Sequence, residues 1–204
     1  MKTAIIDYDA GNLANVVRAA TRAGLDVVVT RDPAEIRNAG ALVLPGVGAM
    51  KDAMDHLDGY GLTDLIREEV KKGKKLVGIC LGMQALYEES EEYGHIKALG
   101  LLPGRIVRFP EGKLKVPHMG WNELVIHRPH EVVEGLPPHS YVYFVHSYYK
   151  VPGDTEDVIA SADYGVTVPA VVGKDNVLGF QFHPEKSGKV GMAIWDRLAK
   201  WLVK

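Results

Sequence analysis

The chain has 204 residues, 47% hydrophobic and 25% charged, and its 24 Lys and Arg nearly balance its 26 Asp and Glu. These globular proportions exclude a disordered, collagen-like or coiled-coil chain, and without a broad basic field neither nucleic acid nor a membrane surface is expected as a partner. One cysteine cannot form an internal disulfide, and no apolar run approaches the roughly 18 residues of a membrane span. We therefore expect a soluble, cytoplasmic protein.

Short apolar runs alternate with helical patterns through the first half of the chain. Buried strands are expected at residues 4–6, 27–29, 41–44 and 76–79. Between these runs, residues 12–23 and 62–72 carry apolar side chains at helical spacing, and the second of these segments is followed by Gly73, a common helix terminator. Strands that alternate with helices predict right-handed crossovers and a parallel sheet covered on both sides.

The second half is rich in β-branched and aromatic residues separated by Gly, Pro and Asp, a pattern typical of antiparallel hairpins. Strands are expected at residues 105–109, 141–151, 157–162, 170–173 and 177–183, with a hairpin tip at Lys174-Asp175-Asn176. A last helix is expected over residues 187–203. Because no repeat or linker interrupts the sequence, residues 1–204 are predicted to form one α/β domain. Its doubly wound, mostly parallel sheet would be flanked by helices and extended by antiparallel strands.

The end of the fourth apolar run has the features of a nucleophile elbow. The expected strand ends at Cys80, and Gly82 permits a tight turn into a helix that begins with Met83 or Gln84. The sulfur of Cys80 would then project from the carboxyl edge of the sheet. The alternative is a buried, inert cysteine, because Cys is among the residue types most often buried.

A base for this thiol is offered by His183-Pro184-Glu185. Residues two apart on an extended strand point to the same side, and Pro184 restricts His183 to an extended conformation. The Glu185 carboxylate would select the imidazole tautomer whose other nitrogen accepts the thiol proton. The alternative is a solvated His–Glu pair after an edge strand. A metal site is disfavoured, since the sequence has neither HExxH nor another cluster with ligand spacing.

Two glycines follow the third apolar run, in Pro45-Gly46-Val47-Gly48. They free the backbone to turn an amide towards a ligand, and one such amide with that of Leu81 would form an oxyanion hole. The alternative is an ordinary turn between a strand and a helix. A dinucleotide site is disfavoured because the third glycine of that motif is missing.

These three motifs, Pro45-Gly-Val-Gly48, Gly78-Ile-Cys80-Leu-Gly-Met-Gln84 and His183-Pro-Glu185, resemble in this order those of class I, triad-type glutamine amidotransferases. A narrower resemblance is to the glutaminase subunits of imidazole glycerol phosphate synthases, and it covers nearly the whole chain. It rests on Asp7-Tyr-Asp-Ala-Gly11-Asn12-Leu13-Ala-Asn15, Pro117-His-Met-Gly-Trp121-Asn122, Phe144-Val-His146-Ser147-Tyr148 and His183-Pro-Glu-Lys186-Ser187-Gly188. Asp9-Ala10 departs from the expected pair, in a segment that concerns docking and not chemistry.

The resemblance implies that Cys80 attacks the side-chain amide of glutamine, giving a γ-glutamyl thioester and ammonia, after which water releases glutamate. His183 would carry the protons and Glu185 would orient it. The amides implied to hold the oxyanion are those of Val47, Gly48 and Leu81. The residues implied to bind glutamine are Gly46, Gln84, Glu92, His146, Ser147 and Tyr148. From the sequence alone, Gln84 is equally a solvent-facing helix residue and Glu92 a member of an acidic run. No cofactor is implied.

The resemblance also implies a partner, because ammonia released into water at neutral pH would mostly be protonated. In this family it passes to a (β/α)8-barrel synthase, with which the glutaminase forms a heterodimer that makes imidazole glycerol phosphate and an aminoimidazole carboxamide ribotide. The residues implied to line the docking face are Asn12, Asn15, Met119, Trp121, Asn122 and Lys186. For Trp121 a core position is an equal alternative. The family further implies weak activity until the barrel binds its nucleotide. Because two glycines flank one peptide unit, we expect the Gly46–Gly48 segment to be the switch.

Other functions remain open at this point. Another amidotransferase glutaminase, serving anthranilate or pyridoxal phosphate synthesis, is disfavoured by the Pro117–Asn122 stretch and by Lys186. A catalytically silent regulatory subunit of the same fold would leave Cys80 unlabelled by a glutamine analogue. A Cys-type α/β-hydrolase is disfavoured because its acid normally precedes the His in the chain.

Overall fold

The computed structural model describes residues 1–112, 114–151 and 156–204, and its centre is an eight-stranded sheet in the order β2-β1-β3-β4-β14-β13-β12-β9. The parallel strands are β1 (Thr3–Ile6), β2 (Val27–Thr30), β3 (Ala41–Leu44), β4 (Lys75–Ile79) and β14 (Val177–Phe180). The antiparallel extension consists of β13 (Thr167–Lys174), β12 (Val158–Asp163) and β9 (Val125–Ile126). The predicted fold class is confirmed: a mostly parallel sheet carries antiparallel strands on one side.

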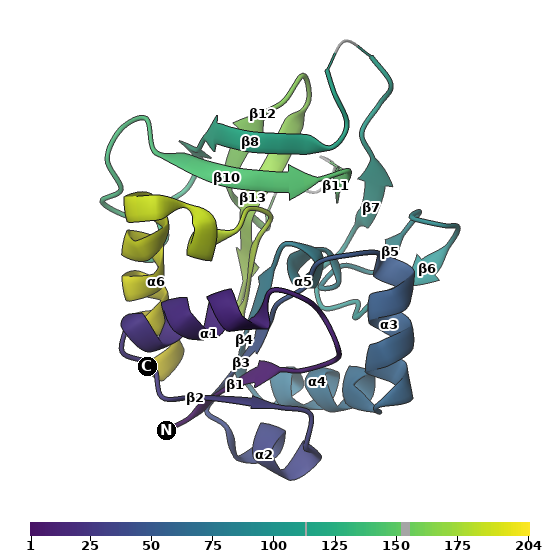
Figure 1. Cartoon of the computed structure of the whole chain (residues 1–204), viewed down its shortest axis with the longest axis vertical. Coiled ribbons are helices and arrows are strands. Elements are labelled where there is room, and N and C mark those ends of the chain that lie inside the picture. The colour runs from purple at the N-terminus through teal and green to yellow at the C-terminus, as the bar shows by residue number, and fades with distance from the viewer. Residues whose placement is uncertain (113, 152–155) are drawn as a thin grey trace.

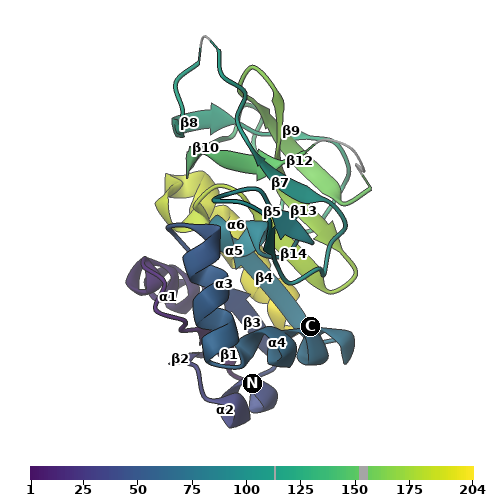
Figure 2. The same ribbon diagram turned by 90° about the vertical axis from the view of Figure 1, so that its right-hand side faces the viewer.

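Helices cover both faces of this sheet (Figures 1 and 2). On one face lie α1 (Leu13–Arg22) and α6 (Gly188–Val203), and on the other α2 (Pro33–Asn38), α3 (Met50–Gly59), α4 (Leu62–Lys71) and α5 (Leu81–Gln84). Alternate residues of each buried strand enter the two cores, as Ile5 and Ile6 do in β1. Trp195 of α6 is fully buried in the first core.

Helix α2 was not predicted, although its start is marked in the sequence. Asp32 accepts hydrogen bonds from the amides of Ala34 and Glu35, and Pro33 occupies the first turn, where its missing N–H is no loss. Helix α3 was also not predicted. It begins at Met50, which Ala49 separates from the Gly-Val-Gly segment. Both helices are therefore additions to the sequence-based description.

Two smaller sheets lie beyond the carboxyl edge of the parallel strands (Figure 1). One pairs β8 (His118–Glu123) with β10 (Tyr141–His146). The other has the order β11 (Tyr148–Lys150), β7 (Arg105–Arg108), β5 (Glu89–Ser90) and β6 (Ile96–Lys97). The prediction of one strand over residues 141–151 is therefore wrong. The chain passes between these two sheets at Ser147, since each half is paired with a different partner strand.

The strand expected over residues 177–183 ends at Phe180. The Gln181 amide still donates to Ala170 of β13 at 2.9 Å, but the amide of His183 donates to the carbonyl of Tyr143 in β10, at 3.0 Å. The hairpin tip predicted at Lys174-Asp175-Asn176 is confirmed, with Asp175 at φ 53°. The strand expected at residues 170–173 is longer, from Thr167 to Lys174.

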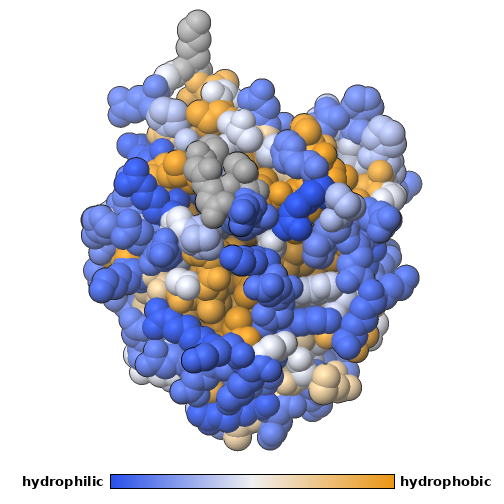
Figure 3. All heavy atoms as spheres, turned by 180° about the vertical axis from the view of Figure 1, so that it is seen from behind, coloured by the Kyte–Doolittle hydropathy of each residue, from blue (hydrophilic) through white to orange (hydrophobic). Residues whose placement is uncertain are grey.

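The surface seen from behind is mostly hydrophilic, and apolar residues show there only as separate areas between polar ones (Figure 3). Within the described ranges, no helix is long and apolar enough to cross a membrane.

Candidate active site

Cys80 lies where β4 turns into α5, in a backbone conformation that is rare for a residue with a side chain, φ 55° and ψ −109°. The turn is tight because backbone packs on backbone: a Cβ on Gly82 would lie 1.8 Å from the carbonyl oxygen of Leu44. A Cβ on Gly78 would lie 2.5 Å from the carbonyl oxygen of Gly82. The helix begins at Leu81 and has one turn, so the expected start at Met83 or Gln84 is wrong.

His183 and Glu185 meet beyond the end of β14. His183 Nδ1 lies 2.7 Å from Glu185 Oε1, and both side chains are completely buried. The alternative of a solvated pair is therefore excluded. The extended backbone expected through Glu185 is wrong, because Pro184–Lys186 forms a turn of 3-10 helix. Pro184 suits the first position of such a turn, and the hydroxyl of Ser187 holds the His183 carbonyl at 2.7 Å.

The electrostatics of His183 favour its protonated form. Burial alone would lower its pKa, but Cys80 and Glu185 together raise the pKa from 6.5 to about 9. Its Nε2 atom is buried and has no hydrogen-bond partner in the part of the chain that the structure describes. Cys80 is 6% exposed, and its sulfur lies 3.9 Å from the carbonyl oxygen of Val145. Cys80 and His183 therefore interact electrostatically, but no thiol–imidazole hydrogen bond is formed in this arrangement.

Asn12 adds a contact to this pair that the sequence did not predict. Its Nδ2 donates to Glu185 Oε1 at 2.6 Å, and its own Oδ1 accepts from Asn15 Nδ2 at 2.7 Å. Asn12 precedes α1 with φ 73°, a left-handed conformation that Asn tolerates better than most residues. A signal was available: Asn12 follows β1, whose carboxyl end lies at the same sheet edge as those of β4 and β14.

The Pro45–Gly48 segment, which we call the oxyanion loop, covers the amide expected to hold an oxyanion. The Leu81 N–H donates to the carbonyl oxygen of Gly46 at 3.3 Å. Gly48 has φ +103°, a conformation that favours glycine. In this arrangement the Gly46 carbonyl, and not a second N–H, faces Leu81. Two donors would converge there only if the peptide between Gly46 and Val47 turned over.

A cavity of about 280 Å³ opens beside Cys80. It is lined by Val47, Gly48, Cys80, Leu81, Gln84, Glu92, Pro117, Val145, His146, Ser147 and Tyr148. The lining includes every residue implied to bind glutamine except Gly46, whose carbonyl is turned to Leu81. Among the described residues, no three His, Cys, Asp or Glu side chains are grouped so that they could hold a metal ion.

Gln84 and Glu92 line this cavity from different elements. Gln84 is buried, and its Nε2 donates to the Tyr148 carbonyl at 2.8 Å and to Gln181 Oε1 at 3.0 Å, so the solvent-facing alternative is wrong. Glu92 accepts the amide of Met50, the first residue of α3, at 2.7 Å. Burial raises the pKa of Glu92 despite this hydrogen bond. Glu92 is therefore a partly desolvated carboxylate in the cavity that Cys80 also lines.

The sequence matches the family model Glutamine amidotransferase class-I over residues 4–197. The chain belongs to this family. It is 54% identical over 198 residues to "Imidazole glycerol phosphate synthase subunit HisH" of Geobacillus thermodenitrificans, covering 95% of this chain and 92% of the relative. It is 50% identical over 201 residues to the protein of the same name from Bacillus subtilis, covering 96% and 94%. The chain is thus a glutamine amidotransferase whose curated relatives are HisH subunits.

Solved structures support the fold of this amidotransferase. One is titled "Crystal structure of glutamine amidotransferase", with a TM-score of 0.75 and 24% identity, covering 97% of this chain and 98% of that one. Another is "Structure of PurLQS from Thermotoga maritima", with a TM-score of 0.73, 18% identity and 98% of each chain covered. At these identities the likeness shows the class I amidotransferase fold alone.

The residues implied to dock the amidotransferase on a partner divide into two groups. Met119 and Trp121 are 61% and 56% exposed, so the core alternative for Trp121 is wrong, and Asn15 and Lys186 are exposed as well. Trp121 reaches the start of α6, since its ring lies 3.8 Å from where a Cβ on Gly188 would be.

The side chains of Asn12 and Asn122 have partners within the chain. Asn12 bonds to Glu185, as described above. Asn122 Nδ2 donates to the carbonyl of Asp163 at 2.7 Å and lies 3.2 Å from Nε2 of His118. The side-chain amides of both residues are therefore engaged within the chain, on the face implied to dock.

Proposed function

We propose that this amidotransferase hydrolyses glutamine through a Cys80 thioester and delivers the ammonia to a (β/α)8-barrel synthase subunit in a heterodimer. The products there would be imidazole glycerol phosphate and an aminoimidazole carboxamide ribotide, in cytoplasmic histidine biosynthesis. Residues 1–204 would act as one amidotransferase domain. The observation that carries this proposal is the buried His183–Glu185 pair beside Cys80, at the edge of a cavity of about 280 Å³.

In the proposed reaction the Cys80 proton passes to His183 Nε2 and the sulfur attacks the side-chain carbonyl carbon of glutamine. His183 then gives the proton to the leaving nitrogen, so that ammonia departs and the γ-glutamyl thioester remains. Water, deprotonated by His183, attacks the thioester and releases glutamate and the thiol. The Glu185 carboxylate, 2.7 Å from Nδ1, would keep the ring oriented through both halves of the cycle.

Substrate binding would use the cavity lining described above. The Glu92 carboxylate would attract the α-ammonium group of glutamine, an attraction strengthened by its partial burial. The backbone of His146, Ser147 and Tyr148 would bind the polar groups at the same end of the substrate. Gln84 would hold this backbone in place through its bond to the Tyr148 carbonyl.

Activation by the partner would act on the oxyanion loop. Because the Gly46 carbonyl takes up the Leu81 amide, the tetrahedral intermediate lacks two converging donors until the peptide between Gly46 and Val47 turns over. Removing one oxyanion donor typically costs about 100- to 1,000-fold in rate. Weak activity of the isolated subunit and strong activity in the complex would follow, with the peptide as the two-state element that the partner biases.

The partner would cover the exposed face around Met119 and Trp121, which lies beyond the carboxyl edge of the sheet, as the cavity does. Ammonia released there would enter the barrel without meeting bulk water. Trp121 has the exposure and size of a typical anchor residue, and Lys186 offers a charge near the same edge.

The test is glutamate release by the purified chain, alone and with a (β/α)8-barrel synthase subunit and its nucleotide. We expect a large increase on adding the partner. Cys80→Ser should abolish glutamine-dependent synthesis and leave synthesis from ammonium salts intact, because the barrel needs only ammonia. Loss of both would point to disrupted folding or docking, whereas wild-type turnover in the variant would remove Cys80 from the mechanism.

The two alternatives give different results. A glutaminase for another synthase would hydrolyse glutamine but not respond to this barrel. A catalytically silent subunit would not be labelled at Cys80 by an electrophilic diazoketone analogue of glutamine.

A further inference from the structure

The hydroxyl of Tyr8 contacts the oxyanion loop from beneath. Tyr8 is 2% exposed, and its hydroxyl donates to the carbonyl oxygen of Pro45 at 2.6 Å. The same oxygen lies 2.3 Å from where a Cβ on Gly46 would be. Tyr8 therefore both binds the first carbonyl of the loop and fills the space against the α-carbon of the next residue. Its ring also belongs to the core beneath α3.

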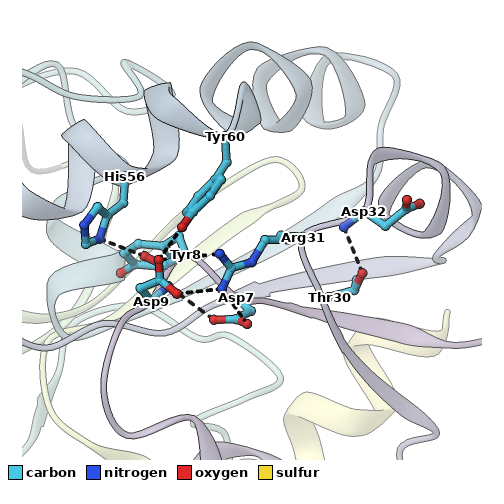
Figure 4. Close-up of polar contacts among 8 residues, drawn as sticks. All are labelled: Asp7, Tyr8, Asp9, Thr30, Arg31, Asp32, His56 and Tyr60. Atoms are coloured by element: carbon cyan, nitrogen blue, oxygen red, sulfur yellow. Dashed lines mark hydrogen bonds and ion pairs between the residues drawn. The ribbon is translucent and has the colours of Figure 1, made fainter.

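Tyr8 itself is held by contacts on both sides of it in the chain (Figure 4). Arg31 binds Asp7 at 2.9 Å and Asp9 at 2.6 Å, so one guanidinium ties together the residues before and after Tyr8. Asp9 also accepts the hydroxyl of Tyr60, over whose ring Arg31 lies at 4.3 Å.

The backbone of Tyr8 has a contact of its own. Its carbonyl oxygen lies 3.0 Å from Nδ1 of His56 in α3 (Figure 4). A residue fixed at its backbone and at both neighbours presents its hydroxyl at a constant position.

We propose that Tyr8 is a positioning residue for the glutaminase reaction: its bond to Pro45 favours the arrangement in which the Gly46 carbonyl covers the Leu81 amide. This inference rests on the proposed function. The Pro45 and Gly46 carbonyls belong to successive peptides joined at the Gly46 α-carbon, so turning the second one changes the torsion ψ of Gly46, at the α-carbon that the Tyr8 hydroxyl contacts. Tyr8 therefore opposes the turn through its hydrogen bond and through the space it occupies.

The state of the hydroxyl supports this role. Burial, and to a lesser degree the charge of Cys80, raise the pKa of Tyr8 far above its ordinary value. The group therefore stays protonated and remains a donor at every pH at which the enzyme works. A buried carbonyl with a permanent donor is costly to move away from it.

Tyr8→Phe tests the proposal, because it keeps the ring and removes only the hydroxyl. We expect kcat for glutamine hydrolysis by the isolated chain to rise roughly 2- to 12-fold, the range that one net hydrogen bond allows. The KM for glutamine should not change, since Tyr8 does not line the cavity. The complex with the barrel subunit should gain less, so that the activation factor falls.

Hydrogen exchange gives a readout that does not depend on turnover. In the isolated Tyr8→Phe variant the Leu81 amide should exchange faster than in the wild type, because the Gly46 carbonyl covers it for less of the time.

Tyr87→Phe is the matched control. The hydroxyl of Tyr87 is also buried and bonded at 2.6 Å, but to Asp157 Oδ2, away from the oxyanion loop. This variant should lose stability without any change in the activation factor or in Leu81 exchange.

The outcomes separate this inference from the proposed function. If the wild type releases glutamate and Tyr8→Phe leaves both kcat and Leu81 exchange unchanged, or lowers kcat equally with and without the barrel, the positioning role is refuted and the proposed function stands. If the wild type releases no glutamate in either state, the proposed function fails and this inference fails with it.

Discussion

Asn12→Gly should slow the reaction without weakening glutamine binding. Asn12 donates to the same Glu185 oxygen that His183 binds, at 2.6 and 2.7 Å. A hydrogen bond to a charged group contributes about 1.5–3 kcal/mol, so its loss from the transition state would lower kcat roughly 10- to 150-fold. Glycine accepts φ 73° without strain and is tolerated before a helix, which keeps the backbone effect small. The KM should stay constant, because Asn12 does not line the cavity.

A pH profile of Cys80 alkylation in the isolated chain distinguishes positioning from a general structural effect. Without the Asn12 donor, His183 alone faces the charge of Glu185, so its pKa should rise above the wild-type value of about 9. The alkaline limb of the profile, which follows the loss of the His183 proton, should then move to higher pH. It should move further still in Asn12→Asp, which adds a carboxylate.

Asn15→Ala is the matched control. It removes only the hydrogen bond from Asn15 to Asn12, so kcat should fall about fivefold or less. The reasoning is refuted if the limb stays in place while kcat falls, or if Asn12→Gly retains wild-type kcat.

Two further predictions concern stability and docking. Because the pKa of His183 is raised from 6.5 to about 9, its contribution to stability is complete below pH 6.5 and is lost as pH rises through 9. The free energy of unfolding in urea should therefore fall over this range, and that of the His183→Asn variant should fall less. Parallel pH profiles of the two free energies would contradict the pKa shift. Trp121→Ala should raise the dissociation constant of the barrel complex by tenfold or more with little change in Tm, because the side chain is 56% exposed. An unchanged dissociation constant would remove Trp121 from the interface.

The parallel half of the sheet could be predicted because its strands are short apolar runs separated by helical periodicity. The strands expected at residues 41–44 and 76–79 match β3 and β4 almost residue for residue. The second half could not be divided correctly, because its strands are selected by partners distant in the sequence. Tyr141–His146 pairs with β8 and Tyr148–Lys150 with β7, and nothing local at Ser147 marks the change of sheet.

The sheet topology made it predictable that the candidate site residues lie close together. The oxyanion loop, Cys80 and His183 each follow a parallel strand, and β3, β4 and β14 are neighbours in the sheet. What the sequence could not supply is the direction of individual groups. The Gly46 carbonyl points at Leu81, and Gln84 points inward at Tyr148, because of contacts made only in the folded chain.

One segment, Asp7–Asn12, contacts both halves of the proposed machinery. Tyr8 bonds to the oxyanion loop and Asn12 to Glu185, and the next turn of chain presents Asn15 on the exposed side. Contiguity alone does not establish coupling, since a contact chain transmits nothing unless it biases an element with two states. In the proposed function the peptide after Gly46 is such an element, and Arg31 ties Asp7 to Asp9 in the segment that contacts it. A partner that displaces Asn15 would therefore need to move only this segment to alter the base and the oxyanion loop together.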